Sequence, residues 1–185
     1  MPRLTADHSL VGLVYSDSAR AEATLAALAD YLQAHDLALA GLIQRALDRP
    51  ASARCDMELE DLATGARTAI ADDRGSGAVG CALDTDALLG ALVRAQATLE
   101  APTDLLLVNK FGKMEAEGSG FRPLIVAALE RGIPTIVAVP ARNLAAWEAF
   151  AADLAMTVPL NDMPLRPPEV LERLGLHLQQ STTTV

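Results

Sequence analysis

The sequence is poor in aromatic side chains and has no long hydrophobic run. Aromatic residues make up 3% of the 185 residues, whereas hydrophobic residues make up 51%, so the core must consist mainly of Ala, Leu and Val. No apolar run approaches the roughly 18 residues that a membrane span requires. No basic stretch followed by an apolar run marks a signal peptide. We therefore expect a cytoplasmic protein that does not enter the membrane.

Basic residues are also scarce. The formal net charge is −9 and the pI about 4.7, and the 15 Lys and Arg residues are scattered along the chain. Binding to a polyanion needs clustered Lys and Arg that neutralise phosphates. We therefore expect neither nucleic acid nor an anionic membrane surface as a partner.

Cysteine and histidine give few metal-binding patterns. Cys55 and Cys81 are too few for a disulfide scaffold or a four-cysteine zinc site. Either they are small packed side chains, or they form a pair that holds a soft metal or responds to oxidation. His8, His35 and His177 lie far apart in the sequence, and we assign them to the surface.

Short apolar runs alternate with longer segments of helical periodicity. The predicted strands are residues 10–15, 37–43, 105–108, 133–139 and 154–158. The predicted helices are about residues 18–34, 84–99, 121–131, 141–152 and 169–178. Fully apolar strands that alternate with helices indicate a mostly parallel sheet with helices on both faces.

An antiparallel hairpin interrupts this alternation. Residues 56–62 and 67–71 alternate in polarity, and Gly65 stands at the turn between them. The fold class is therefore a three-layer α/β domain with an inserted β-hairpin. We expect one domain over residues 1–178 and a disordered tail over residues 179–185.

Ligands of parallel α/β folds bind beyond the carboxyl ends of the strands, where two loops invite comparison with a P-loop. A P-loop uses glycines to expose backbone N–H groups, a Lys for the phosphates and a Ser or Thr for magnesium. The first loop, SDSARAEATL at 16–25, has no glycine, and Glu22 and Ala23 stand where the Lys and the hydroxyl residue belong. Ser16 and Ser18 have no evident His partner for nucleophilic catalysis. We expect no conventional ATPase activity.

The second loop carries a resemblance to a known family. Residues 105–115, LLLVNKFGKME, resemble the Walker B region of the thermophilic nucleoside-triphosphatase family, which ends in a pattern close to DEIGKME. In that family the Asp and Glu serve magnesium and water activation. Asn109 and Lys110 occupy those positions here. The resemblance implies a P-loop-NTPase-like fold over about residues 8–160.

A closer resemblance covers most of the chain. An uncharacterised bacterial family of P-loop-like proteins shares the features CDM, GC-x-LD and VNKFGKxEAEG, which here are residues 55–57, 80–84 and 108–118. That family is commonly associated with molybdenum uptake genes. The resemblance implies a molybdenum-related context, and it implies no established activity.

The two charge replacements suggest one arrangement. Glu22 replaces a base and Lys110 replaces an acid at positions that are close together in the parent fold. We expect either an ion pair between them across the old phosphate site or two independent solvated charges. Arg20, Lys113 and Arg122 lie near Lys110, and these cations either converge on a small anion at the helix N-terminus or form ordinary surface charge.

Acidic residues oppose an anion at this place. Glu115 and Glu117 are either metal ligands or general bases, or they are loop and helix-cap acids that fix the FGKME segment. The candidate ligand-binding residues are Ser16, Asp17, Ser18, Arg20, Glu22, Asn109, Lys110, Lys113, Glu115 and Arg122.

The sequence favours a non-catalytic ligand-binding or interaction protein on a degenerate P-loop fold, and the family resemblance implies a link to molybdenum metabolism. One alternative is a carrier of molybdate, tungstate or another small oxyanion, or of a metal. Others are an atypical nucleoside-triphosphatase and a purely protein-binding domain. We lean towards a homodimer, because many P-loop relatives associate with copies of themselves.

Overall fold

The fold is built on a mixed sheet of seven strands. The computed structural model describes residues 2–45, 57–72, 82–161 and 166–179. Within them the strand order is β10-β2-β9-β8-β3-β4-β5. The strands are β10 (Ala155–Pro159), β2 (Leu10–Tyr15), β9 (Thr135–Pro140), β8 (Leu105–Val108), β3 (Leu39–Gln44), β4 (Glu58–Asp61) and β5 (Arg67–Ala69). The first five run parallel, and β4 and β5 are antiparallel.

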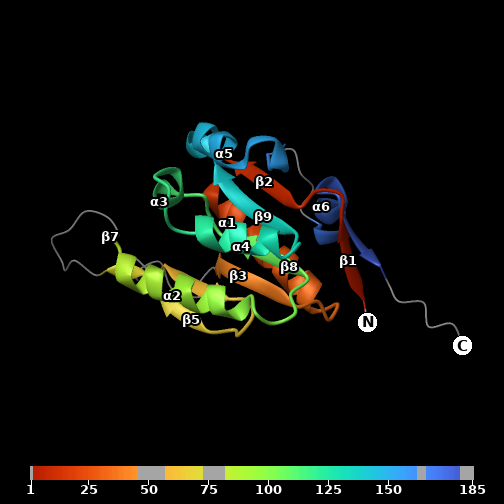
Figure 1. Cartoon of the computed structure of the whole chain (residues 1–185), viewed down its shortest axis with the longest axis horizontal. Coiled ribbons are helices and arrows are strands. Elements are labelled where there is room, and N and C mark those ends of the chain that lie inside the picture. The colour runs from red at the N-terminus through yellow and green to blue at the C-terminus, as the bar shows by residue number, and fades with distance from the viewer. Residues whose placement is uncertain (1, 46–56, 73–81, 162–165, 180–185) are drawn as a thin grey trace, which may run out of the picture.

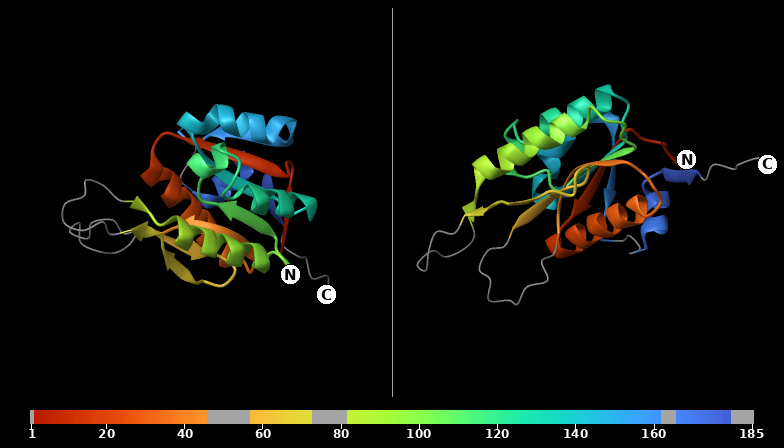
Figure 2. Two further views of the ribbon diagram at one scale, coloured as in Figure 1. Left: turned by 60° about the vertical axis from the view of Figure 1, so that its left-hand side comes forward. Right: turned by 90° about the horizontal axis from the view of Figure 1, so that it is seen from below.

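Helices cover both faces of this sheet (Figures 1 and 2). They are α1 (Ser18–Gln33), α2 (Thr85–Thr98), α3 (Lys113–Ala116), α4 (Arg122–Glu130), α5 (Leu144–Ala151) and α6 (Pro167–Arg173), with the 3-10 turns η1 (Ala141–Asn143) and η2 (Ala152–Leu154). One core cluster lies between the sheet and α1 and α6, and the other lies under α2, α4 and α5. The predicted three-layer α/β domain is confirmed.

The strands serve both cores because they are buried on both faces. Along β3, Leu39 and Ile43 belong to the α1 side, whereas Ala40 and Leu42 belong to the α2 side. Close approach of backbones also fixes the sheet. At Gly41, φ is +109° and an added Cβ would lie 1.9 Å from the carbonyl oxygen of Leu107 in the neighbouring strand, so only glycine fits.

The inserted hairpin and the helix starts follow the sequence pattern. Strands β4 and β5 pair around a turn in which Gly65 has a φ of +71°. The Asp17 side chain caps α1 by accepting from the backbone of Arg20, and Asp84 caps α2 by accepting from Ala87. The second of the two predicted loops, which follows β8, is not entirely irregular, because it contains the short helix α3.

The C-terminal prediction was wrong in part. The helix expected over residues 169–178 ends as α6 at Arg173, because Gly175 adopts a φ of +65°. The chain then forms β11 (Leu176–Gln179), which pairs antiparallel with β1 (Arg3–Ala6), a strand that the sequence pattern did not predict. A further two-stranded ribbon joins β6 (Ala71–Asp72) to β7 (Ala82–Leu83).

Across residues 2–45, 57–72, 82–161 and 166–179, no helix combines the length and the apolar character that a membrane crossing needs.

Candidate functional site

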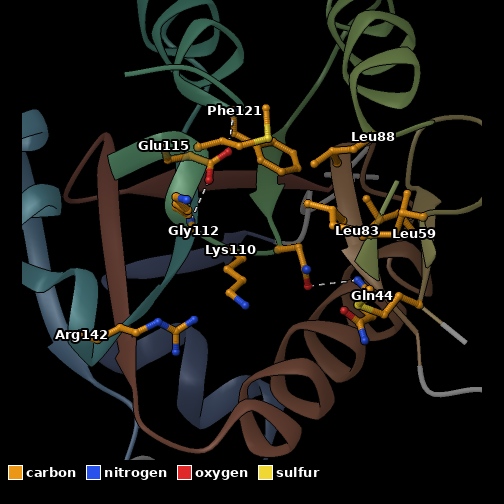
Figure 3. Close-up of a pocket in the computed structure, with 14 residues that line it drawn as sticks. Gln44, Leu59, Leu83, Leu88, Lys110, Gly112, Glu115, Phe121 and Arg142 are labelled. Atoms are coloured by element: carbon orange, nitrogen blue, oxygen red, sulfur yellow. Dashed lines mark hydrogen bonds between the residues drawn. The ribbon is translucent and has the colours of Figure 1, made fainter. Parts of the chain in front are cut away.

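Two pockets lie side by side beyond the carboxyl ends of the parallel strands. The smaller pocket, of about 210 Å³, is lined by Tyr15, Ser16, Ser18, Pro140, Ala141 and Arg142. The larger pocket, of about 250 Å³, is lined by Gln44, Met57, Leu59, Ile70, Leu83, Leu88, Asn109, Lys110, Gly112, Lys113, Met114, Glu115, Phe121 and Arg142 (Figure 3). Arg142 borders both pockets, so together they form one divided cleft.

The smaller pocket lies at the end of β2, where the first of the two predicted loops begins. It follows β2 and contains the hydroxyls of Ser16 and Ser18, both of which the sequence predicted as ligand-binding residues. Burial raises the pKa of the Tyr15 phenol, and Glu22 adds to this, whereas Arg142 and a hydrogen bond with Ser18 lower it. Because the net shift is upward, Tyr15 keeps its proton and can act as a hydrogen-bond donor.

The larger pocket combines an apolar wall with a charged rim. Side chains of the hairpin, of α2 and of the loop after β8 form the wall, among them Leu59, Leu88 and Phe121. Lys110 and Arg142 come from two different loops and reach toward the same open space (Figure 3). Sequence reasoning missed Arg142, because no motif marks the loop after β9.

These two cations are not neutralised by a direct partner. In the part of the chain that the structure describes, neither the Lys110 ammonium nor the Arg142 guanidinium forms a hydrogen bond or an ion pair. Lys110 is half-buried and Arg142 is exposed. A partly buried cation is usually paired. The rim of the larger pocket is therefore a place where an incoming anion could be bound.

Glu22 and Lys110 interact without touching. Burial raises the pKa of the half-buried Glu22 carboxyl, and the charge of Lys110 partly lowers it again. However, the described residues include no ion pair between them within 4.0 Å. The topology explains this, because β9 lies between β2 and β8 and separates the two loops by two strand spacings, or about 10 Å. The expected direct ion pair is not formed.

Glu115 organises the loop after β8. Its carboxylate is buried, and it accepts hydrogen bonds from the backbone N–H groups of Gly112 at 2.7 Å and Phe121 at 2.8 Å. At Gly120, with φ of +63°, an added Cβ would lie 2.0 Å from the Glu115 carboxylate. Both carboxylate oxygens are therefore occupied by the backbone. The arrangement favours the loop-fixing role over the metal or general-base role.

Arg122 lines neither pocket, so of the two alternatives for the cations, convergence of Arg122 with Lys110 is not the one observed. Its guanidinium lies over the rings of Phe150, at 4.8 Å, and Phe111, at 5.6 Å, and its Nε donates to the carbonyl of Glu115. Lys113 lies on the rim of the larger pocket, but it is exposed and its Nζ is 3.8 Å from Glu117.

The remaining predicted residues have largely structural surroundings. The Asp17 side chain is the cap of α1, and it adds a negative charge beside the smaller pocket. Arg20 lies in the first turn of α1 and borders neither pocket. Asn109 lines the larger pocket, and its side-chain oxygen accepts from the backbone of Gln44 at 3.1 Å, which joins β8 to β3.

Metal binding finds no support in the described residues. Cys55 and Cys81 lie outside them. Over residues 2–45, 57–72, 82–161 and 166–179, no group of three or more His, Cys, Asp and Glu side chains is arranged to hold a metal ion.

The family of the chain can be assigned from residues 10–166, which match the family described as protein of unknown function DUF2478. The chain belongs to this family. The match includes both loops of the cleft and the Phe111–Glu115 segment that carried the sequence resemblance, so the predicted family is confirmed.

A relative of this DUF2478 chain has a molybdenum-related name. Over 136 residues the chain is 35% identical to the molybdenum import ATP-binding protein ModC 2 of Bradyrhizobium diazoefficiens. The match covers 71% of this chain and 15% of that protein. The chain thus spans a small part of the relative's length.

A solved structure confirms the predicted fold. The crystal structure of THEP1 from the hyperthermophile Aquifex aeolicus is similar, with a TM-score of 0.54. The match covers 89% of this chain and 98% of THEP1 at 13% sequence identity. This DUF2478 chain therefore has the THEP1-like P-loop fold, as predicted from the second loop.

Proposed function

We propose that this chain is a non-catalytic protein that binds a small anion in the divided cleft and serves molybdenum metabolism. The proposal rests on the exchange of charges that the sequence resemblance predicts at the old phosphate site. A half-buried Glu22 stands where a P-loop lysine would bind phosphates, and Lys110 stands where a magnesium-binding acid would be.

This exchange opposes nucleotide hydrolysis. A carboxylate near a triphosphate repels it, and Ala23 offers no hydroxyl for magnesium. The loop also lacks the glycines that would let successive backbone N–H groups face phosphates. The hydrophobic wall of the larger pocket suits binding better than phosphoryl transfer, as do Lys110 and Arg142, which form no ion pair with the residues that the structure describes.

The cleft offers the donors that an anion needs. Tyr15, Ser16 and Ser18 contribute hydroxyls, and Arg142 contributes a planar guanidinium that can bind two oxygens at once. Asp17 and Glu22 limit the attraction, because both are acidic and lie near the same pocket. We therefore propose one bound anion of low charge.

The molybdenum context comes from the relative. ModC 2 is named a molybdenum import ATP-binding protein, and a segment like this chain makes up only a small part of it. We propose that this chain acts in the cytoplasm beside such an ATP-binding protein, which would supply the ATP hydrolysis that the cleft does not support.

Thermal unfolding with a ligand panel tests the proposal. The panel contains Mg-ATP, Mg-GTP, molybdate, tungstate, sulfate and phosphate. A ligand at about 100 times its Kd adds about 2.7 kcal/mol to stability, which a melting curve detects. We expect an anion to raise the melting temperature, and we expect Arg142→Ala to abolish the increase. The matched control is Arg173→Ala, which removes an exposed cation on α6, outside both pockets. Stabilisation by Mg-ATP with turnover would refute the non-catalytic role.

A further inference from the structure

The geometry points to an organic anion as the ligand: a small phosphate or carboxylate with an apolar body, whose head lies between Lys110 and Arg142 and whose body fills the larger pocket. This inference rests on the proposed anion-binding function and specifies the class of the anion. Its basis is that the cations and the apolar wall belong to the same cavity.

The apolar wall is not needed for an inorganic oxyanion. Leu59, Leu83 and Leu88 line the larger pocket, and they offer no hydrogen-bond donor to molybdate or phosphate. Ligand sites in proteins are typically apolar cavities with a few polar groups that fix orientation. A hydrophobic body attached to the anion would remove this surface from water, and the gain would add to the binding of the head.

The positions of Lys110 and Arg142 indicate where the anionic head of the ligand would lie. Lys110 and Arg142 extend into the cleft from the loops after β8 and β9, and no side chain of the described residues hydrogen-bonds to them or forms an ion pair with them (Figure 3). Arg142 also borders the smaller pocket. A head placed between the two cations can therefore reach the hydroxyls of Ser16 and Ser18 while its body remains in the larger pocket.

The acids of the cleft limit the charge of the ligand. Glu115 lines the larger pocket, but its carboxylate oxygens already accept from two backbone N–H groups. Glu22 lies close enough for Lys110 to affect its pKa. The pocket sets Lys110, Lys113 and Arg142 against these two acids, and Lys113 already lies 3.8 Å from Glu117, so little excess positive charge remains. A singly or doubly charged head suits this balance better than a triphosphate.

The size of the cavity limits the body. The larger pocket holds about 250 Å³. A phenyl ring or a short alkyl chain fits this space. Phenyl phosphate and benzoate are therefore suitable probes, and inorganic phosphate is the matched ligand without a body.

Titration calorimetry with these three probes tests the inference. We expect phenyl phosphate to bind at least about tenfold more tightly than inorganic phosphate, from burial of the ring. Lys110→Met should lower the affinity for phenyl phosphate by about tenfold. Leu83→Asn should lower the affinity for phenyl phosphate and for benzoate, but it should leave the affinity for inorganic phosphate unchanged. Melting curves of the unliganded variants first establish that each is folded.

The control for Leu83 is a leucine of equal exposure outside the pocket. Leu83 is 44% exposed and lines the pocket, whereas Leu89 is 42% exposed on α2 and does not. Leu89→Asn should bind all three probes like the unmodified protein. Equal effects of the two leucine variants would overturn the placement of the body. Equal affinity for phosphate and phenyl phosphate would overturn the inference and leave the proposed function standing. Binding of none of the probes, together with no oxyanion in the panel above, would overturn both.

Discussion

Glu115 and Gly112 are joined by a 2.7 Å hydrogen bond in which the backbone N–H of Gly112 donates to the buried carboxylate. The other carboxylate oxygen binds the backbone N–H of Phe121, so one side chain holds both ends of the loop that carries α3. This loop follows β8 and forms one side of the larger pocket. The shape of the pocket therefore depends on Glu115.

Removing this carboxylate should destabilise the protein strongly. Glu115→Ala leaves two buried N–H groups without an acceptor, at about 1–3 kcal/mol each, so we expect a loss of about 2–6 kcal/mol in the free energy of unfolding. Glu115→Gln should lose less, since one oxygen acceptor remains. Urea denaturation measures both. The control is Glu117→Ala, which removes an exposed acid from the same loop and should change stability by less than about 0.5 kcal/mol. Equal losses for Glu115→Ala and Glu117→Ala would contradict the idea that the two hydrogen bonds to Glu115 hold the loop together.

Gly120 should tolerate no side chain, because a Cβ there would clash with Glu115. Comparison with Gly132 separates this clash from backbone strain. Gly120 and Gly132 have similar φ values, +63° and +70°, so alanine suffers similar backbone strain at both. At Gly120 the new Cβ would also lie 2.0 Å from the Glu115 carboxylate, whereas nothing lies within 4 Å at Gly132. We expect Gly132→Ala to cost about 1–2 kcal/mol and Gly120→Ala at least about 1 kcal/mol more. Similar melting temperatures for the two variants would show that the Glu115 side chain moves away from the new Cβ at little cost.

Glu22 should make the protein less stable as the pH rises. Its folded-state pKa is raised by burial, so between its ordinary pKa and the folded value the native state binds more protons than the unfolded state. Stability is therefore lost as the pH rises through this window. Glu22→Gln removes the ionisation, and we expect it to stabilise the protein at pH 7 by at most about 1 kcal/mol, because the site is partly exposed. The difference from the unmodified protein should shrink toward pH 4. A difference that is constant from pH 4 to pH 8 would argue against ionisation as its cause.

Arg45 joins three elements through a partly buried ion-pair network. Burial alone lowers the pKa of Arg45, but hydrogen bonds to Glu60 and Asp30 raise it above its ordinary value, so the charge is well supported. Its Nε and Nη2 bind the carboxylate of Glu60 at 3.0 and 3.3 Å, and its Nη1 lies 2.8 Å from Asp30 on α1. We expect Arg45→Met to cost about 2–3 kcal/mol, because Glu60 loses this partner.

The two acids of this network should differ in effect. The Glu60 side chain is 13% exposed and that of Asp30 is 65% exposed. We expect Glu60→Gln to cost about 1–2 kcal/mol and Asp30→Asn less than about 0.5 kcal/mol, because solvent screens exposed pairs. Chemical denaturation of both variants provides the measurement. A larger loss of stability for Asp30→Asn than for Glu60→Gln would mean that the ion pair with α1 contributes more than the one with β4.

The sequence predicted the sheet and its helices because buried parallel strands are short apolar runs with clear boundaries. It could not predict α3, because a four-residue helix has no periodicity and depends on the two hydrogen bonds to Glu115. The end of the chain was interpreted as helix through residue 178. There, Leu174, Leu176 and Leu178 alternate with other residues, a period-two signal that was available but overlooked.

The site was less predictable than the fold, because it depends on strand order. Neither loop sequence reveals that β9 separates β2 from β8, so the separation of Glu22 and Lys110 and the position of Arg142 between the two pockets could not be inferred. The position of Arg122 could not be predicted for a different reason. Its aromatic partners Phe111 and Phe150 are distant in the sequence, and their convergence exists only in the folded chain.

The pairing of β1 with β11 places Arg3 opposite Gln179, so the polypeptide enters and leaves the fold at nearly the same point. In Figure 1 this point lies at the far side of the molecule from α3 and β7, which border the cleft. A domain with this geometry can be inserted into a surface loop of a host protein with little separation between the two junctions. It can also be circularly permuted by a short linker between the two strands. In either case the cleft would remain open to solvent.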